Sequence, residues 1–122
     1  MTRTITAHKR GTQTEFFASI WLTIRGYKIL EKRYNSAYGE IDILAQKGKT
    51  LIAVEVKYRA ENNTAFEAIS SKQVSRISNS LLSFQASHTR YMSFNLRVDA
   101  LVYSKTSYWK RFIPTHLKNI GI

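Results

Sequence analysis

Several kinds of residue are missing or scarce in this 122-residue chain, and each absence narrows what the protein can be. Cysteine does not occur, which excludes disulfide bonds and thiolate-bound zinc and makes a reducing cytoplasm the expected location. There are one proline and five glycines, and 43% of the residues are hydrophobic, so the composition indicates a globular chain without a low-complexity tract. We expect one domain over residues 1–122, built around a single modest core.

Long hydrophobic runs are also missing. The apolar run Phe16–Ile24 is far shorter than the roughly 20 residues that span a bilayer, so no membrane association is expected. Acidic residues are scarce, because 19 Lys and Arg face only 8 Asp and Glu, for a formal net charge of +11. Basic side chains that neutralise phosphates release counterions from nucleic acid. We therefore expect DNA as the partner and leave RNA open.

Hydrophobic periodicity predicts an α/β fold with the element order α-β-β-β-α-β. A first helix is expected from a capping-box pattern at Thr12–Glu15 up to a stop at Gly26. Strands are expected at 27–33, 40–46, 50–58 and 94–102, with a short helical turn at 64–67 and a long helix at 71–87. The helical crossover between the third and fourth strands favours parallel pairing. A last edge strand is expected at 108–113, before Pro114.

Three of the few acidic residues lie in two of these strands. Lys47-Gly48-Lys49-Thr50 is typical of a two-residue hairpin with glycine first, the type II′ pattern. If Lys47 pairs with Thr50, then Asp42 lies opposite Glu55, and Glu40 lies opposite Lys57. Because side chains alternate along a strand, all four then share one face. An opposed Asp/Glu pair is destabilising unless a proton or a cation lies between the carboxylates.

This arrangement is suited to metal-assisted phosphate chemistry. Asp42 and Glu55 offer the oxygen ligands that Mg²⁺ or Mn²⁺ prefers, and a bound metal can activate water beside a phosphate. Lys57 can orient that water or neutralise developing charge, and Glu40 supports the pair. The alternative is a solvated hairpin face with an ordinary Glu40–Lys57 ion pair. Four converging charged residues in so basic a chain favour the catalytic interpretation.

The spacing of Asp42, Glu55 and Lys57 resembles the PD-(D/E)XK nuclease motif. The blocks at 39–45, 54–59, 67–73 and 97–99 resemble, in this order, the YraN-like family of endonuclease-like bacterial proteins, whose fold is similar to that of archaeal Holliday-junction resolvases. The resemblance covers nearly the whole chain. It implies a restriction-endonuclease-like core, with a mixed sheet flanked by helices, and metal-dependent DNA cleavage.

The same resemblance brings in residues outside the hairpin. Gly11-x-x-x-Glu15 matches the family, which makes Glu15 a candidate outer member of the site, although Thr14 stands where the family usually has glycine. The alternative role for Glu15 is to cap the first helix. The Arg97-x-Asp99 block raises the chance that Asp99 borders the site, and a local ion pair is the alternative. The three histidines form no spaced pair, so no role is assigned to them.

The sequence thus predicts a Mg²⁺- or Mn²⁺-dependent endodeoxyribonuclease that recognises DNA structure, such as a junction, flap or single strand. Candidate phosphate contacts are Arg59 and, beside the positive end of the long helix, Lys72, Gln73 and Arg76. A solvated helical face is their alternative role. Two other classes stay open: a non-catalytic nucleic-acid-binding module with the same fold, and a basic RNA-binding or ribosome-associated protein. The resolvase resemblance also points to a homodimer.

Overall fold

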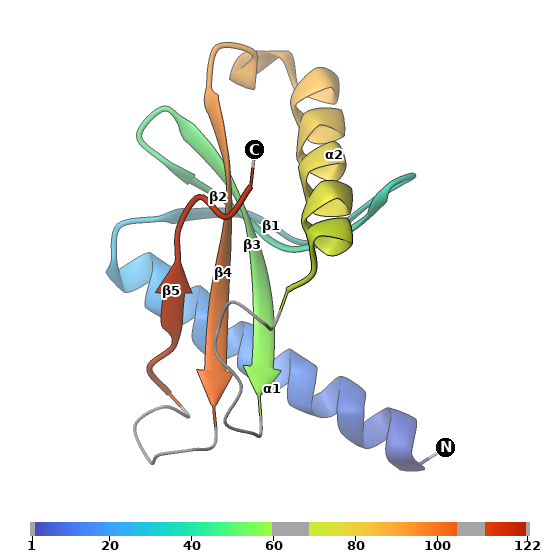
Figure 1. Ribbon diagram of the computed structural model, residues 1–122. Helices are drawn as coiled ribbons and strands as arrows, with labels where there is room; N and C mark the ends of the chain where they lie inside the picture. Colours follow the sequence, from blue (N-terminus) through green and yellow to red (C-terminus); the bar gives the residue numbers. More distant parts are fainter. Residues whose placement is uncertain (1, 60–68, 105–111, 122) are drawn as a thin grey trace.

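The computed structural model describes residues 2–59, 69–104 and 112–121 and shows an α/β fold (Figure 1). Its elements are α1 (Thr2–Ile24), β1 (Lys28–Ser36), β2 (Gly39–Lys47), β3 (Thr50–Arg59), α2 (Ser71–Ser87), a 3₁₀ turn (Thr89–Tyr91), β4 (Asn95–Ser104) and β5 (Thr115–Leu117). The predicted order α-β-β-β-α-β is confirmed through β4, and it is consistent with a restriction-endonuclease-like core. The predicted helical turn at 64–67 lies outside the described residues.

The strands form one mixed sheet in the order β1-β2-β3-β4-β5. β3 and β4 are parallel, as the crossover through α2 requires, and the other neighbouring pairs are antiparallel. The edge strand differs from the prediction. Phe112 and Ile113 form a turn and a bend, and β5 begins after Pro114 instead of ending before it; residues 108–111 lie outside the described part.

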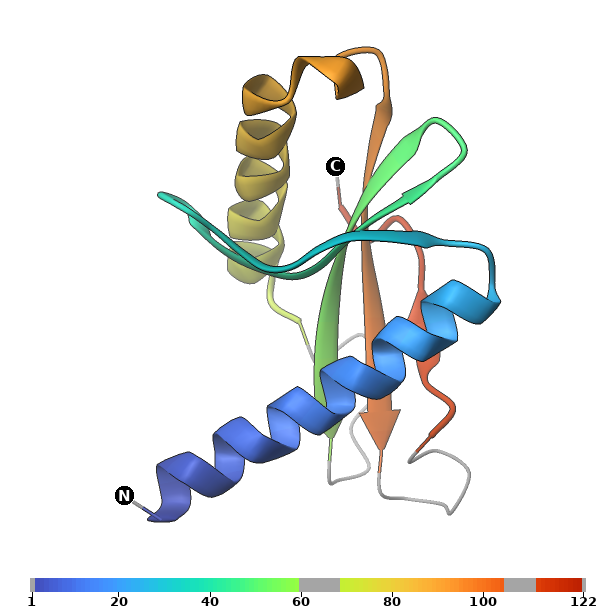
Figure 2. The ribbon, with the colours of Figure 1, turned by 180° about the vertical axis from the view of Figure 1, so that it is seen from behind.

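The two helices cover opposite faces of this sheet (Figures 1 and 2). On one face, Ala18 and Leu22 of α1 pack in a core that includes Ile52 and Val54 of β3. On the other face, the α2 side chains Ile77, Leu81 and Phe84 pack in a core that includes Leu51 and Ala53. Side chains of β3 therefore alternate between the two cores, and this alternation continues to Glu55 and Lys57, which lie on the α2 face.

The ends of the helices show which local signals hold. α1 begins at Thr2, so the capping box expected at Thr12 is wrong, because Glu15 lies well inside the helix. Its other end is as predicted: Gly26 has φ of 90°, and the Tyr27 N–H donates to the Leu22 carbonyl at 2.9 Å, as in a Schellman motif. α2 has the predicted bounds, and the Ser70 side chain caps it by accepting from the Gln73 N–H at 3.1 Å.

The β2–β3 hairpin has the predicted register. Lys47 pairs with Thr50, and Gly48 has φ of 59° while Lys49 is not among the positive-φ residues, as a type II′ turn requires. The ladder ends at the Ile43–Val54 pair. Beyond it, β1 and β2 continue as a two-stranded ribbon that leaves the sheet towards α2 (Figures 1 and 2).

Buried serine contacts hold the tip of this ribbon against α2. The Ser80 hydroxyl, which is 0% exposed, donates to the Gly39 carbonyl at 3.1 Å and lies 2.7 Å from the Ser36 hydroxyl. Ser36 itself donates to the same carbonyl at 3.1 Å. The tip of the ribbon is therefore fixed by α2.

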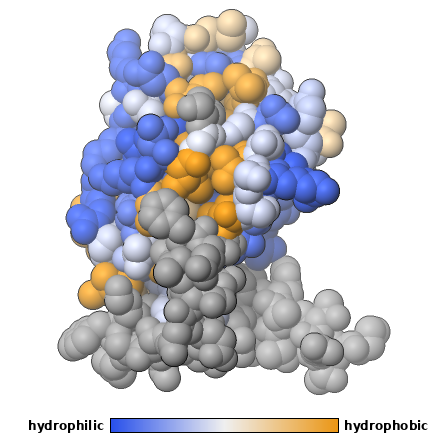
Figure 3. Space-filling view, in the orientation of Figure 1, coloured by the Kyte–Doolittle hydropathy of each residue, from blue (hydrophilic) through white to orange (hydrophobic). Residues whose placement is uncertain are grey.

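Hydrophobic residues on the face seen in Figure 3 gather in a narrow band with hydrophilic residues on both sides.

The C-terminal segment closes the edge of the α2 core, because Ile120 packs against it and donates its N–H to the Val98 carbonyl at 2.8 Å. Within the described residues, neither helix combines the length and the apolar character that a membrane crossing needs.

Candidate active site

Asp42 lies where β2 leaves β3. Its Oδ2 accepts a hydrogen bond from the Val56 N–H at 2.8 Å, so a side chain takes the place that a strand carbonyl would otherwise fill. The predicted register would also pair Asp42 with Glu55 and Glu40 with Lys57. In the structure, the pairing between β2 and β3 ends before it reaches either pair. The Asp42 carboxylate is instead held beside β3 by this single bond to the backbone.

Glu55 brings a second carboxyl group to the same place from β3. It is 8% exposed, and its Oε2 accepts a hydrogen bond from Gln73 Nε2 of α2 at 2.9 Å. Burial raises the pKa of Glu55 to about 9, and the hydrogen-bonding contact with Asp42 adds to this rise, while Lys57 and Gln73 oppose it. Without a cation, the carboxyl pair therefore keeps one proton at neutral pH. Gln73, a predicted phosphate contact, orients this carboxyl group in the structure.

Arg33 is a member of the site that sequence reasoning missed. It lies on β1, and its neighbours pair with the neighbours of Asp42, so the two residues stand across from each other. Its Nε donates to Glu15 Oε1 at 2.9 Å. Glu15 is the main cause of the raised Arg33 pKa, and Glu40 and Asp42 raise it further. Glu15 is thus joined to the Asp42 region through Arg33 rather than acting as a helix cap.

The backbone of Arg33 is unusual, because φ is 55° in a residue other than glycine. Left-handed conformations of such residues are uncommon and often occur at functional sites. A signal in the sequence could have located Arg33. Extending the β1–β2 register outward from the two-residue turn between Ser36 and Gly39 places it opposite Asp42.

The remaining predicted residues lie at different distances from the carboxyl pair. Lys57 is half-buried and close enough to Glu55 to oppose the rise of its pKa. Glu40 is exposed on the ribbon, near Arg33 but not paired with Lys57. Lys72 and Arg76 are exposed on α2, on either side of Gln73 in the sequence. Arg59 ends β3, and its side chain is outside the described part.

The carboxyl pair has oxygens that a divalent cation could use. Asp42 Oδ2 accepts from the Val56 N–H and Glu55 Oε2 accepts from Gln73, while the two carboxyl groups also contact each other. No group of three or more His, Asp or Glu side chains that could hold a metal ion occurs in the described ranges. A divalent cation held by this pair would therefore have to take its other ligands from waters or from phosphate, as Mg²⁺ commonly does.

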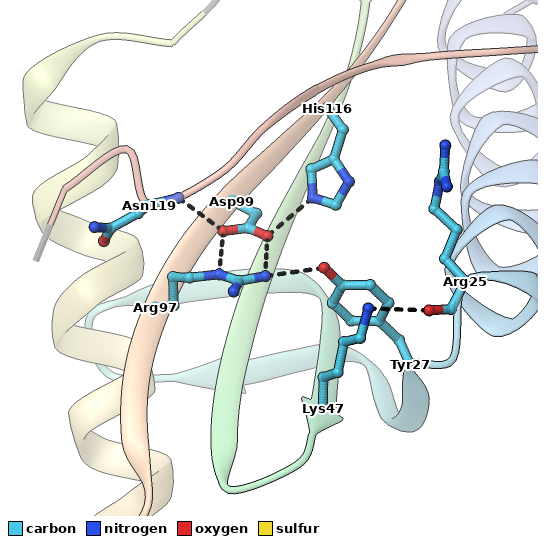
Figure 4. Close-up of polar contacts among 7 residues, drawn as sticks. All are labelled: Arg25, Tyr27, Lys47, Arg97, Asp99, His116 and Asn119. Carbon is cyan, nitrogen blue, oxygen red and sulfur yellow. Dashed lines mark hydrogen bonds and ion pairs between the residues drawn. The ribbon is translucent and has the colours of Figure 1, made fainter.

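Asp99 belongs to a different cluster, on the α1 face (Figure 4). Its fully buried carboxylate accepts from Arg97 Nε and Nη2 at 2.9 and 2.8 Å, from the Asn119 N–H and from His116. Burial raises the pKa of Asp99, but the hydrogen bonds together hold it below its usual value. The local ion pair expected as one alternative is present. Sequence reasoning missed His116, because only the folded C-terminal segment brings it to Asp99.

Comparison with known proteins gives consistent matches. Residues 14–102 match the model of the family described as "Uncharacterised protein family UPF0102". A UPF0102 protein of Bradyrhizobium diazoefficiens is 34% identical over 113 residues, which are 93% of this chain and 81% of the relative. Another, from Methylorubrum extorquens, is 34% identical over 94% of this chain and 89% of the relative. The chain therefore belongs to the UPF0102 family.

Proposed function

We propose that this protein is a divalent-metal-dependent nuclease that hydrolyses DNA phosphodiester bonds at structured sites such as junctions, flaps or single strands. The observation that carries the proposal is the placement of two carboxyl groups, Asp42 and Glu55, against each other beside Lys57 in a chain of net charge +11. A basic protein gains little from holding two acids in contact unless a cation can replace the proton between them. The proposal includes a cytoplasmic location and a homodimer on duplex substrates.

Each residue has a role in this proposal. Asp42 and Glu55 would hold Mg²⁺ or Mn²⁺, with Val56 and Gln73 fixing their orientation. The chemistry that such a cation supplies is charge neutralisation at the phosphate and a lower pKa for a bound water. Lys57 orients that water or stabilises the charge that develops on the phosphate.

Residues farther out in the site hold it together and bind substrate. Arg33 links Glu15 to the region of Asp42 and Glu40. Lys72 and Arg76 are exposed on α2, the helix that contacts Glu55 through Gln73, so they are placed to bind the phosphates of the substrate.

One observation favours a second candidate, a non-catalytic nucleic-acid-binding module. Because the pKa of Glu55 is about 9, the pair is stable at neutral pH with a proton and without a metal ion. The hydrogen bonds from Val56 and Gln73 would then serve the fold alone. The two candidates differ in whether a divalent cation displaces this proton.

Cleavage assays separate these candidates. Purified protein is incubated with labelled single-stranded, duplex, flap and four-way-junction DNA, in Mg²⁺, in Mn²⁺ or in EDTA. We expect cleavage of at least one substrate with metal and none with EDTA. Asp42→Asn and Lys57→Ala should each lower the rate by about 10²-fold or more, as expected for groups that bind the metal or stabilise charge in the transition state.

The matched control is Lys49→Ala, which removes an exposed lysine from the β2–β3 turn. This variant should cleave at the wild-type rate. Binding of every substrate without cleavage in either metal would overturn the nuclease proposal in favour of the binding module. Equal cleavage by wild type and Asp42→Asn would show that a contaminating nuclease, not this site, is responsible.

A further inference from the structure

A second polar site lies on the face of the sheet opposite Glu55. The end of α1, the start of β1, the β2–β3 hairpin and the C-terminal segment enclose a pocket of about 250 Å³. Its walls are Trp21, Arg25, Tyr27, Lys47, His116 and Lys118. Because a water molecule takes about 30 Å³, this space can hold a group of several heavy atoms.

The pocket carries a positive charge that nothing described nearby neutralises. Arg25, Lys47 and Lys118 form no ion pair with a carboxylate among the described residues. The buried acid behind the pocket, Asp99, already accepts four hydrogen bonds, two of them from Arg97 (Figure 4). Asp99 therefore compensates Arg97, and the part of the chain that the structure describes offers no other counter-charge to the three cations of the pocket.

Local contacts hold two of these cations in place before any ligand binds. Lys47 Nζ donates to the Arg25 carbonyl, left open at the end of α1, at 3.1 Å and lies 4.6 Å from the centre of the Tyr27 ring (Figure 4). The Arg25 guanidinium lies 4.1 Å from the centre of the Trp21 ring. Cations that rest on aromatic rings lose less conformational freedom when they bind an anion.

Trp21 offers a way to observe the pocket. The Trp21 indole Nε1 is buried and has no hydrogen-bond partner within the described part of the chain. Because Trp21 also lines the pocket, its indole N–H signal should respond when the pocket is filled. Three cations, with no free carboxylate beside them among the described residues, match an anion with several oxygens.

We propose that this pocket binds a phosphate group. The phosphate belongs either to a free nucleotide or to the backbone of a nucleic acid, since both present the same charged oxygens. The pocket lies on the α1 face, whereas Glu55 faces α2, so the site is separate from the carboxyl pair and stands whether or not that pair binds a metal.

The test uses the indole N–H of Trp21 as the probe. ¹H–¹⁵N NMR spectra are recorded in EDTA at constant ionic strength, while inorganic phosphate, a nucleoside 5′-monophosphate or a short single-stranded oligonucleotide is added. A Trp109→Phe variant assigns the Trp21 signal, because the chain has two tryptophans. We expect a saturable shift of this signal, and about tenfold weaker binding in Arg25→Ala and in Lys118→Ala.

Lys49→Ala is the control, because it removes an exposed lysine of the same hairpin that does not line the pocket. This variant should bind as the wild type does. Saturation by phosphate and nucleotide would identify a free ligand, and saturation by the oligonucleotide alone would identify the nucleic-acid backbone. The absence of a saturable shift with all three, or an equal loss of affinity in Lys49→Ala, would overturn the proposal.

Discussion

The Glu55 carboxyl group makes the stability of the protein depend on pH. Its pKa is about 9 in the folded chain and near 4.5 when unfolded, so between these values the folded state binds the extra proton. The free energy of unfolding must then fall as pH rises through this window. We expect the melting temperature of the wild type to fall more steeply from pH 5 to pH 9 than that of Glu55→Gln. In this variant the side chain at position 55 does not titrate.

Glu31→Gln is the matched control, because Glu31 is exposed on β1. It should keep the wild-type slope in the same calorimetric series. Mg²⁺ should raise the melting temperature of the wild type more at pH 9 than at pH 6, since a cation replaces the proton, and it should do so less in Asp42→Asn. Parallel slopes for Glu55→Gln and wild type would contradict the assigned pKa.

The sequence predicts these acids better than it predicts their partners. The spacing of Asp42, Glu55 and Lys57 follows from strand alternation and one turn, both of which are local properties. The bond from Val56 to Asp42 exists because the strands separate there, and the Arg33 backbone is left-handed. Neither feature leaves a local pattern, because both depend on where the ribbon packs.

At the scale of elements, the position of the β1–β2 ribbon depends on α2. Ser80 is fully buried and joins the Gly39 carbonyl and the Ser36 hydroxyl. Ser80→Ala should lower the free energy of unfolding by about 1–2 kcal/mol, because it leaves the Gly39 carbonyl and the Ser36 hydroxyl without this buried hydrogen-bonding partner. It should also slow cleavage, if the nuclease proposal holds, by loosening the ribbon that carries Asp42. Chemical denaturation and the cleavage assay measure the two effects.

The control for this prediction is Ser75→Ala, on the exposed side of the same helix. Its stability should equal or slightly exceed that of the wild type, because alanine is the better helix former. A Ser80→Ala protein as stable as Ser75→Ala would show that the ribbon does not depend on this contact.

Helices and strands were predicted well where a sequence pattern within the helix or strand itself marks its bounds. The bounds of α2 follow from its apolar spacing, and Gly26 ends α1. The start of α1 was missed because Thr12 forms a plausible cap that the longer helix does not use. The edge strand β5 was not predicted because its three residues carry too short a pattern to recognise, and pairing with β4 decides its position.

Across the whole molecule, the charges are divided between the two faces of the sheet. The carboxyl pair and the start of α2 lie on one face, and the basic pocket lies on the other. The net charge of +11 alone predicts non-specific attraction to nucleic acid, but it does not say which face is used. The salt dependence of binding can locate that face, because it counts the phosphates that the protein neutralises.

We expect the α2 face to contribute to duplex binding through Lys72 and Arg76. Each of Lys72→Ala and Arg76→Ala should reduce the slope of log K against log salt concentration by about 0.9, as measured by fluorescence anisotropy in EDTA. Arg90→Ala removes the same charge just beyond the other end of α2, about 25 Å along a 17-residue helix, and should leave the slope unchanged. Equal slopes for all three variants would assign the attraction to net charge, and the α2 face would then not be the DNA-binding surface.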